Sequence, residues 1–238
     1  DKVFAGTLLI AASFTNPTIA QESETVASGY TWANQRVIKI TYSNANIQSP
    51  VYYFKSTVAG TVASGVVTAA CGTSTNPGTC SSSSVTTLAA NTWYKTTSTT
   101  VSVTYTANGT LYALTSDGTN LSGSASYTIS KISTGTPTAP TITGGSTSWS
   151  SSAKTISVST ASTETSGILK YQYYVSTSSS SQTGGSWTDC STSTTSQSIS
   201  TNGTRYIYFR AIANNGKTSS ASAYQTTKVD TGTPTAPT

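Results

Sequence analysis

The sequence predicts an all-β protein of two tandem antiparallel β-sandwiches, preceded by an extended N-terminal strand. Residues 131–141 recur as residues 228–238 with two substitutions, at a spacing of 97 positions, about the length of one sandwich domain. Short runs rich in Val, Ile and Tyr alternate with Gly, Ser and Asn turns, which is typical of strands. No segment has the sustained periodicity of a helix.

Aligning the two copies of the repeat divides the chain into modules. We expect an extended strand at 1–16, a first sandwich at 17–136, a second at 137–234, and the start of a further linker or repeat at 235–238. The repeated linker is rich in proline, which fixes φ and removes a backbone donor. We therefore expect an extended, semi-rigid connection between the modules.

Alternation of side chains is clearest in two strands of the second module, at 168–175 and 206–212. In the later strand, the face expected in the core consists of Ile207, Phe209 and Ala211. In the earlier strand, one face is shared by Leu169, Tyr171 and Tyr173. We expect Trp149 and Trp187 in the core, with a surface position as the alternative.

A set of motifs in the second module carries a resemblance to a known family. The motifs are Ser166-Gly-Ile, Tyr171-Gln-Tyr-Tyr, Trp187, Asn202-Gly-Thr, Phe209-Arg-Ala, Asn215-Gly, Ser219 and Val229-Asp-Thr-Gly-Thr-Pro. This set resembles bacterial Ig-like domain repeats, which occur in large surface proteins. The resemblance covers about 17–238 and implies an Ig-like fold and a surface location, with no catalytic residues and no obligatory cofactor. The first module departs from it, with Tyr112-Ala-Leu for Phe-Arg-Ala and Ser133 in place of Asp230.

The ionisable residues exclude most catalytic chemistry. The chain has no histidine, so Ser-His-Asp and Cys-His catalysis and imidazole-ligated metals are impossible. Its seven acids are scattered; Glu164 lies in an ordinary turn sequence, and Asp117 and Asp230 are isolated. We therefore predict no enzyme activity, no catalytic residue, no metal site and no cofactor.

Charge and hydropathy point to an extracellular protein. The net charge is +5, but the cations are scattered singly, so we expect a solvated surface and no nucleic-acid partner. No apolar run approaches the roughly 20 residues that span a bilayer. The abundant Ser and Thr suit a secreted protein, and the absence of methionine leads us to expect a processed product or a fragment.

Three cysteines permit one disulfide. Cys71 and Cys80 bracket a turn-rich loop, so a bridge between them is geometrically easy, and we predict it. The alternative is a pair of free thiols. A disulfide fits an oxidising compartment. Cys190 is left over and aligns with Cys71 in the second repeat.

The N-terminal segment matches nothing in the second module. One face of the extended strand carries Phe4, Leu8, Ile10, Ala12 and Phe14, with Gly6 interrupting the row. An apolar strand of this kind needs a partner strand, because exposed backbone groups invite aggregation. It is either an edge strand of its own first sandwich or a donor strand that fills a groove in a neighbouring copy of the chain. The second alternative generates open filaments.

Two functions are compatible with these features. The first is an extracellular structural protein, a surface stalk or pilus-like filament subunit whose partners are other copies of itself. The alternative is an adhesin that binds a host glycan or protein through exposed loop aromatics. The candidate ligand contacts are Trp93, Tyr94 and Trp187, and the candidate glycosylation sites are Asn108, Asn120 and Asn202.

Overall fold

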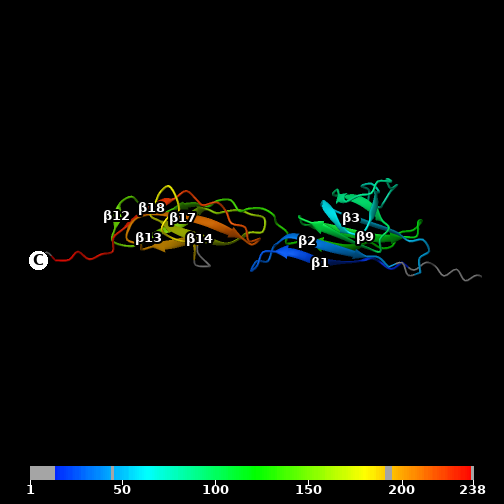
Figure 1. The fold of residues 1–238 in the computed structure, drawn as a ribbon, viewed down its shortest axis with the longest axis horizontal. Coiled ribbons are helices and arrows are strands. Elements are labelled where there is room, and N and C mark those ends of the chain that lie inside the picture. Colours follow the sequence, from blue (N-terminus) through cyan, green and yellow to red (C-terminus); the bar gives the residue numbers. More distant parts are fainter. Residues whose placement is uncertain (1–13, 44–45, 191–194, 237–238) are drawn as a thin grey trace, which may run out of the picture. The chain divides into compact units, whose positions relative to one another are not determined.

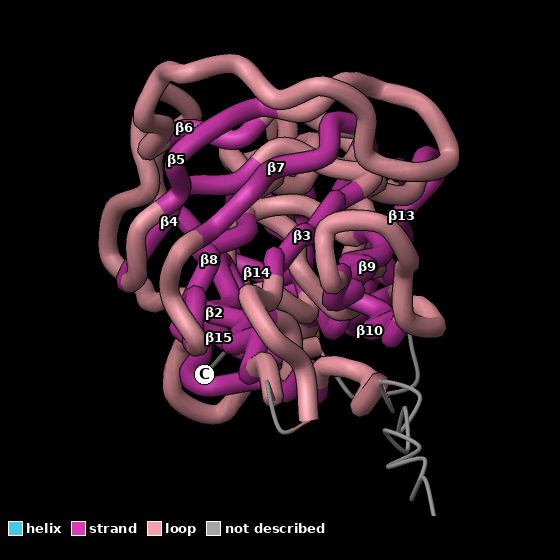
Figure 2. The backbone as a smooth tube through the Cα atoms, turned by 90° about the vertical axis from the view of Figure 1, so that its right-hand side faces the viewer, coloured by secondary structure: helices cyan, strands magenta, loops and turns pink. Residues whose placement is uncertain are grey.

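A computed structural model describes residues 14–43, 46–190 and 195–236. Strands are the regular secondary structure in these ranges, drawn in magenta in Figure 2 between pink loops. The prediction of an all-β chain is confirmed. The chain divides into two compact units, the first comprising 14–26 with 33–133 and the second 27–32 with 134–236.

The first unit contains two five-stranded antiparallel sheets (Figure 1). One sheet has the order β1 (Thr18–Val26), β2 (Ala33–Thr41), β8 (Thr100–Tyr105), β4 (Gly60–Ser64) and β6 (Thr87–Leu88). The other has the order β10 (Ala125–Ile129), β9 (Gly109–Ser116), β3 (Val51–Ser56), β7 (Thr92–Thr96) and β5 (Val67–Ala70). Alternate residues of both sheets point inward and form a sandwich core.

The core of the first unit is built from β-branched and aromatic side chains. Its fully buried members include Ile38, Ile40, Phe54, Val101, Val103, Tyr105 and Leu111. Ile38 and Ile40 lie two positions apart in β2, and Val101 and Val103 lie opposite them in β8. This spacing of two is what places a whole row of side chains on one face of a strand.

The second unit pairs a three-stranded sheet with a five-stranded one (Figure 1). The smaller sheet has the order β11 (Thr141–Thr143), β13 (Lys154–Thr160) and β16 (Ser196–Ile199). The larger has the order β12 (Trp149–Ser150), β18 (Gln225–Val229), β17 (Gly203–Ala213), β14 (Ile168–Ser176) and β15 (Thr188–Asp189). The β12–β18 pair is parallel, and the other pairs are antiparallel.

The predicted inward face of β17 is confirmed. Ile207, Phe209 and Ala211 are fully buried. They belong to a core cluster that also contains Ile142, Ile156 and Ile199 from the smaller sheet. The two sheets of this unit therefore share one apolar interior.

Two predictions about apolar side chains of the second unit are wrong. Leu169 does not share the inward face with Tyr171, because a register shift lies between Ile168 and Lys170 and leaves Leu169 47% exposed. Trp149 is 61% exposed, because it lies in β12, a two-residue strand at the end of its sheet. A bulge and a short edge strand each leave an apolar side chain without cover.

The two copies of the linker sequence differ in their surroundings. In the first copy Pro137 and Pro140 are buried, and the backbone N–H of Thr138 donates to the carbonyl of Thr163. In the second copy residues 230–236 are exposed. The first copy is thus packed along the second unit instead of standing free as a polyproline-like spacer.

Candidate functional site

The predicted disulfide joins Cys71 to Cys80. Cys71 follows β5 directly and is fully buried, while the loop between the two cysteines is largely exposed. The loop is held back against its base, because the N–H of Gly78 donates to the Cys71 carbonyl at 2.8 Å. The N–H of Ser81 donates to the Ala70 carbonyl at 2.7 Å. The disulfide therefore fixes a compact loop on the first unit.

This loop covers one side of Trp93. The indole Nε1 of Trp93 donates to the carbonyl of Ser74 at 2.9 Å, and the backbone N–H of Trp93 donates to the carbonyl of Gly72 at 2.8 Å. Trp93 is 3% exposed. The expectation that Trp93 and Tyr94 sit exposed at a loop tip is wrong, since both lie within β7.

Tyr94 points to the opposite face of β7 from Trp93. It is 4% exposed, packs against Phe54 in the sandwich core and accepts the N–H of Ala89 at its hydroxyl. Successive residues of a strand alternate between faces, so only one of the two aromatics can serve the outer surface. Tyr94 is a core residue.

A row of three side chains crosses the outer face of the sheet. Lys55 in β3 lies opposite Trp93 in β7 on one side and opposite Tyr112 in β9 on the other. The Nζ atom of Lys55 lies 5.1 Å from the centroid of the Trp93 ring. An ammonium at this distance from an indole face is held by a cation–π interaction.

A cavity of about 410 Å³ opens beside this row, which we call the Trp93 cavity. Its lining residues are Lys55, Thr57, Thr75, Asn76, Asn91, Trp93, Tyr112, Leu114 and Ser124. The floor is aromatic and aliphatic, and the rim carries amides and hydroxyls. Of the described residues that line it, Lys55 alone is charged. The cavity therefore combines an apolar floor with one fixed cation.

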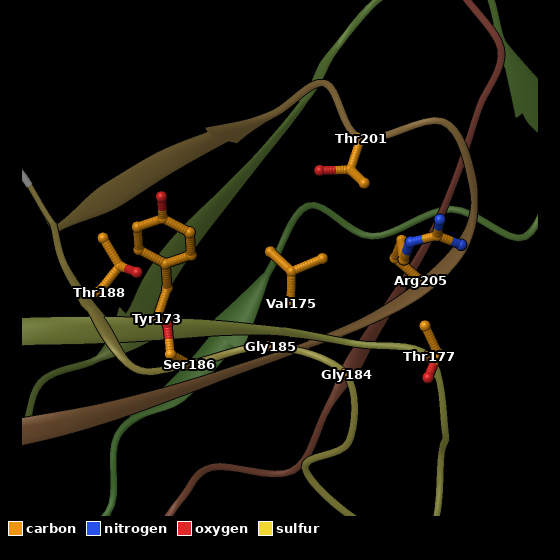
Figure 3. Close-up of a pocket in the computed structure, with 9 residues that line it drawn as sticks. All are labelled: Tyr173, Val175, Thr177, Gly184, Gly185, Ser186, Thr188, Thr201 and Arg205. Carbon is orange, nitrogen blue, oxygen red and sulfur yellow. The ribbon is translucent and has the colours of Figure 1, made fainter.

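A second cavity, of about 330 Å³, lies in the second unit (Figure 3). Its lining residues are Tyr173, Val175, Thr177, Gly184, Gly185, Ser186, Thr188, Thr201 and Arg205. Figure 3 shows Tyr173 and Val175 pointing to the same side of one strand, with Thr188 beside Tyr173 and Arg205 at the other end. Tyr173 also packs on Phe209, so this floor belongs partly to the core.

Trp187 lies in the chain between Ser186 and Thr188, which line this second cavity, and its side chain is half-buried. Its ring packs edge-on against Tyr174 at 5.5 Å, and the guanidinium of Arg210 lies 4.4 Å from its centroid. The prediction of a core position for Trp187 is therefore only partly met. The same packing occupies the indole that was considered as a ligand contact.

The three candidate glycosylation sites make different contacts. Asn108 forms two hydrogen bonds with the backbone of Ile132, one from Nδ2 and one to Oδ1. Asn120 donates from Nδ2 to the carboxylate of Asp117 at 3.3 Å. Asn202 is exposed, and its Oδ1 accepts the N–H of Thr231 at 3.2 Å. All three lie at turns, in line with the turn preference of asparagine.

A polar cluster in the second unit holds the first linker copy. The Oε2 atom of Glu164 accepts the N–H of Ser166 at 2.6 Å, and the Oγ atom of Ser166 accepts the N–H of Asn215 at 3.2 Å. Asn215 in turn donates from Nδ2 to the carbonyl of Gly135 at 2.8 Å. Lys217 donates to the carbonyl of Thr134. We call Glu164, Ser166, Asn215 and Lys217 the linker clamp.

Sequence reasoning treated Glu164 as an ordinary turn residue and missed the clamp. The turn is present, since the N–H of Gly167 donates to the Glu164 carbonyl at 2.9 Å. The sequence signal for the clamp was that an Asn-Gly pair and the Thr-Gly-Thr-Pro linker motif belong to the same set of motifs. The sequence did not show that these two motifs are in contact.

The predicted donor-strand residues lie mostly outside the described residues. These are Phe4, Gly6, Leu8, Ile10 and Ala12. Phe14 is half-buried and precedes β1. Strand β1 stands at the end of its sheet, beside β2.

Two general features of the described residues bear on the class of site. Within 14–43, 46–190 and 195–236, no three His, Cys, Asp or Glu residues gather where they could hold a metal ion. The part of the chain that the structure describes contains no helix that is long and apolar enough to cross a membrane.

The chain is distantly similar to several solved structures. No family model and no curated protein matches the chain. Among solved structures, the FN1-FN3 domains of chicken CNTN1 are similar over 90% of this chain and 68% of that one, at 12% identity and a TM-score of 0.32. Fibronectin(III)-like modules of Clostridium thermocellum CbhA are similar over 89% and 93%, at 12% identity and a TM-score of 0.27.

A third similarity is to the Endo-D glycoside hydrolase domain of Streptococcus pneumoniae R6, over 88% of this chain and 37% of that one, at 13% identity and a TM-score of 0.28. The class of the protein is defined by its own sheets and cores. It is a tandem β-sandwich protein with a disulfide in its first unit.

Proposed function

We propose that the chain is an extracellular structural protein, a surface stalk or pilus-like filament subunit built of Ig-like modules. The observation that carries this proposal is the way in which the linker is held at both ends. In the first unit Asn108 bonds to Ile132, and the N–H of Ser133 donates to the Ala33 carbonyl at 3.0 Å. In the second unit the linker clamp binds the backbone carbonyls of Thr134 and Gly135.

This arrangement suits a load-bearing connection. Each unit fixes its own end of the linker by hydrogen bonds within that unit. A flexible tether would instead carry unattached Gly and Ser residues. The Cys71–Cys80 disulfide supports an oxidising, extracellular setting.

The filament form of the proposal uses residues 1–15 as a donor strand. An extended apolar strand adds to the edge of a sheet in a neighbouring subunit through backbone hydrogen bonds. Repetition of such a head-to-tail contact gives an open filament of identical chains. The position of β1 at a sheet edge supports an assembly of this kind.

Electron microscopy of the purified full chain tests the filament form. Filaments should appear with the native sequence and disappear on deletion of residues 1–15 or on Leu8→Asp, which places a charge on the apolar face. Thr7→Asp is the matched control, because it places the same charge on the opposite face of the strand. Filaments of normal length from the deletion variant, or none from the native sequence, would contradict the filament role.

An adhesin is the second candidate function, and the Trp93 cavity favours it. The candidate ligand-binding surface is therefore this cavity, and not the exposed loop aromatics that the sequence predicted. Binding of a host glycan or protein there would be compatible with a stalk, since adhesive surface proteins carry binding sites on structural modules.

A further inference from the structure

The Trp93 cavity has the chemistry of a small-ligand site, and we infer that it binds an acidic sugar, a pyranose ring that carries a carboxylate. This inference specifies the ligand of the alternative adhesin role. It is independent of filament assembly, because the site lies in the first unit and needs neither residues 1–15 nor a second copy of the chain. Its volume falls in the usual range of small-molecule sites, about 300–1,000 Å³.

The floor of the cavity is rigid before any ligand arrives. Trp93 is fixed along one edge by its Nε1 bond to Ser74, in the loop closed by the disulfide. Leu114 is 3% exposed and belongs with Trp93 and Cys71 to a small apolar cluster beneath the loop. Because Trp93 and Leu114 are each 3% exposed, they support the floor from beneath and need no further ordering when a ligand binds above them.

An aromatic floor suits a pyranose. One face of such a ring carries several C–H groups, which pack on the electron-rich face of an aromatic side chain. Tyr112 is the half-buried aromatic side chain of the lining and lies next to Lys55 in the cross-strand row, whereas Trp93 is 3% exposed and has its ring covered by the Lys55 ammonium. A sugar packed on the Tyr112 ring would meet the neighbouring Lys55 ammonium directly.

The rim offers both hydrogen-bond donors and hydrogen-bond acceptors. The amides of Asn76 and Asn91 each offer donors and an acceptor, as sugar hydroxyls do. Asn91 adopts φ = +57°, a left-handed conformation that asparagine tolerates better than most residues. Its N–H donates to the Ser56 carbonyl at 2.7 Å, which fixes this backbone and places the side chain at the rim.

The charge of the lining selects an acid. Lys55 is the one charged residue among the described residues of the cavity, and its Nζ atom lies over the Trp93 ring at 5.1 Å. No carboxylate lines the described cavity to neutralise it. A ligand carboxylate therefore gains an ion pair that a neutral sugar lacks, and this gain falls as salt is added.

The backbone around the cavity argues against an extended peptide as the ligand. Strand β3 is paired with β7 and β9, β7 with β3 and β5, and β9 with β3 and β10. Each floor strand thus has both edges occupied, and strand addition requires a free edge. A ligand that binds through ring faces and hydroxyls needs no such edge.

Binding to the full chain can be followed by NMR through the four tryptophan indole N–H signals. D-glucuronate is the test ligand and D-glucose its neutral control. We expect saturable shifts of the Trp93 signal, identified by its loss in Trp93→Phe, with glucuronate binding at least about tenfold tighter than glucose, or about 1.4 kcal/mol. A peptide rich in glutamate tests the alternative class of ligand.

Two lysine variants separate a site effect from a general charge effect. Lys55→Gln should reduce glucuronate binding to the level of glucose. Lys95→Gln should leave it unchanged, because Lys95 lies on the same strand as Trp93 and outside the cavity lining. Asn76→Ala, at an exposed loop position, should weaken both sugars without unfolding the chain.

The inference is overturned if neither sugar gives saturable shifts, if both bind equally, if Lys55→Gln has no effect, or if the acidic peptide alone binds. Glucuronate binding by a chain that forms no filaments would support this inference while contradicting the filament role. The two proposals can therefore fail separately.

Discussion

The side chain of Asn108 pairs with both backbone polar groups of Ile132. Its Nδ2 atom donates to the Ile132 carbonyl at 3.1 Å, and its Oδ1 atom accepts the Ile132 N–H at 2.8 Å. The same Asn-Gly-Thr motif recurs at Asn202, whose Oδ1 accepts the N–H of Thr231. In both units, this asparagine fastens the segment that leads into a copy of the linker.

Removal of the Asn108 side chain should destabilise the first unit. Ile132 is 2% exposed, so Asn108→Ala would leave its N–H and its carbonyl without their side-chain partner. We expect the free energy of unfolding of the first unit to fall by about 2–3 kcal/mol. Urea denaturation of the full chain measures this change.

Asn202→Ala is the matched control from the second unit. The bond from Thr231 to Asn202 is exposed, so water can replace the lost partner. We expect a loss of less than about 1 kcal/mol. Equal losses in the two variants would show that the burial of Ile132 does not decide how much the asparagine contributes to the free energy of unfolding.

The sequence predicted the features of this fold that depend on local alternation. Ile207, Phe209 and Ala211 were assigned to the core because strand side chains alternate with a period of two, and all three are fully buried. The Cys71–Cys80 pairing followed from a short loop with turn residues. Neither inference needed knowledge of which strands are neighbours.

The features that sequence reasoning missed depend on distant segments. Trp93 is covered by the 71–80 loop, and its neighbour Lys55 comes from another strand, so the Trp93 cavity has no local signature. Glu164 and Asn215 meet only after folding. Leu169 was misplaced because a bulge breaks the period of two, which composition does not reveal.

Reduction of the disulfide should weaken the first unit. The bridge closes a loop with a sequence separation of 9. Removing such a link raises the conformational entropy of the unfolded chain, which lowers the free energy of unfolding by about 2–3 kcal/mol. Urea denaturation with and without reductant should show this loss. The Cys71→Ser/Cys80→Ser double variant should match the reduced protein and should not respond to reductant. A response of the double variant would assign the effect to something other than this bridge.

Gly144 and Gly118 provide a test of backbone crowding. Both have positive φ, +102° and +94°, so an alanine at either position is strained. A Cβ on Gly144 would also overlap the carbonyl oxygen of Thr155, whereas a Cβ on Gly118 meets nothing within 4 Å. We expect Gly144→Ala to cost about 3 kcal/mol and Gly118→Ala about 1 kcal/mol. Similar losses of stability for the two variants in thermal denaturation would show that the positive φ alone, and not the contact with Thr155, determines the effect.

The buried thiol of Cys190 should react slowly in the folded protein. Cys190 is 2% exposed and packs in the core of the second unit. Burial, and then the neighbouring Asp189, raise the pKa of the Cys190 thiol to about 11. Because the thiolate is the reactive form, a disulfide reagent such as Ellman's should modify Cys190 only slowly until denaturant exposes it. Rapid labelling of the native protein would contradict the buried position.

The same thiol should make the stability of the second unit depend on alkaline pH. Its pKa is higher in the folded state than in the unfolded chain, so the protonated thiol stabilises the fold fully below the ordinary thiol value of about 8.5. That contribution is lost as pH rises toward about 11, because the unfolded chain ionises first. Urea denaturation across this range should show a steeper loss for the native sequence than for Cys190→Ala. The two proteins differ only at position 190, so every other residue is common to both, and parallel curves would show that Cys190 ionisation is not coupled to folding.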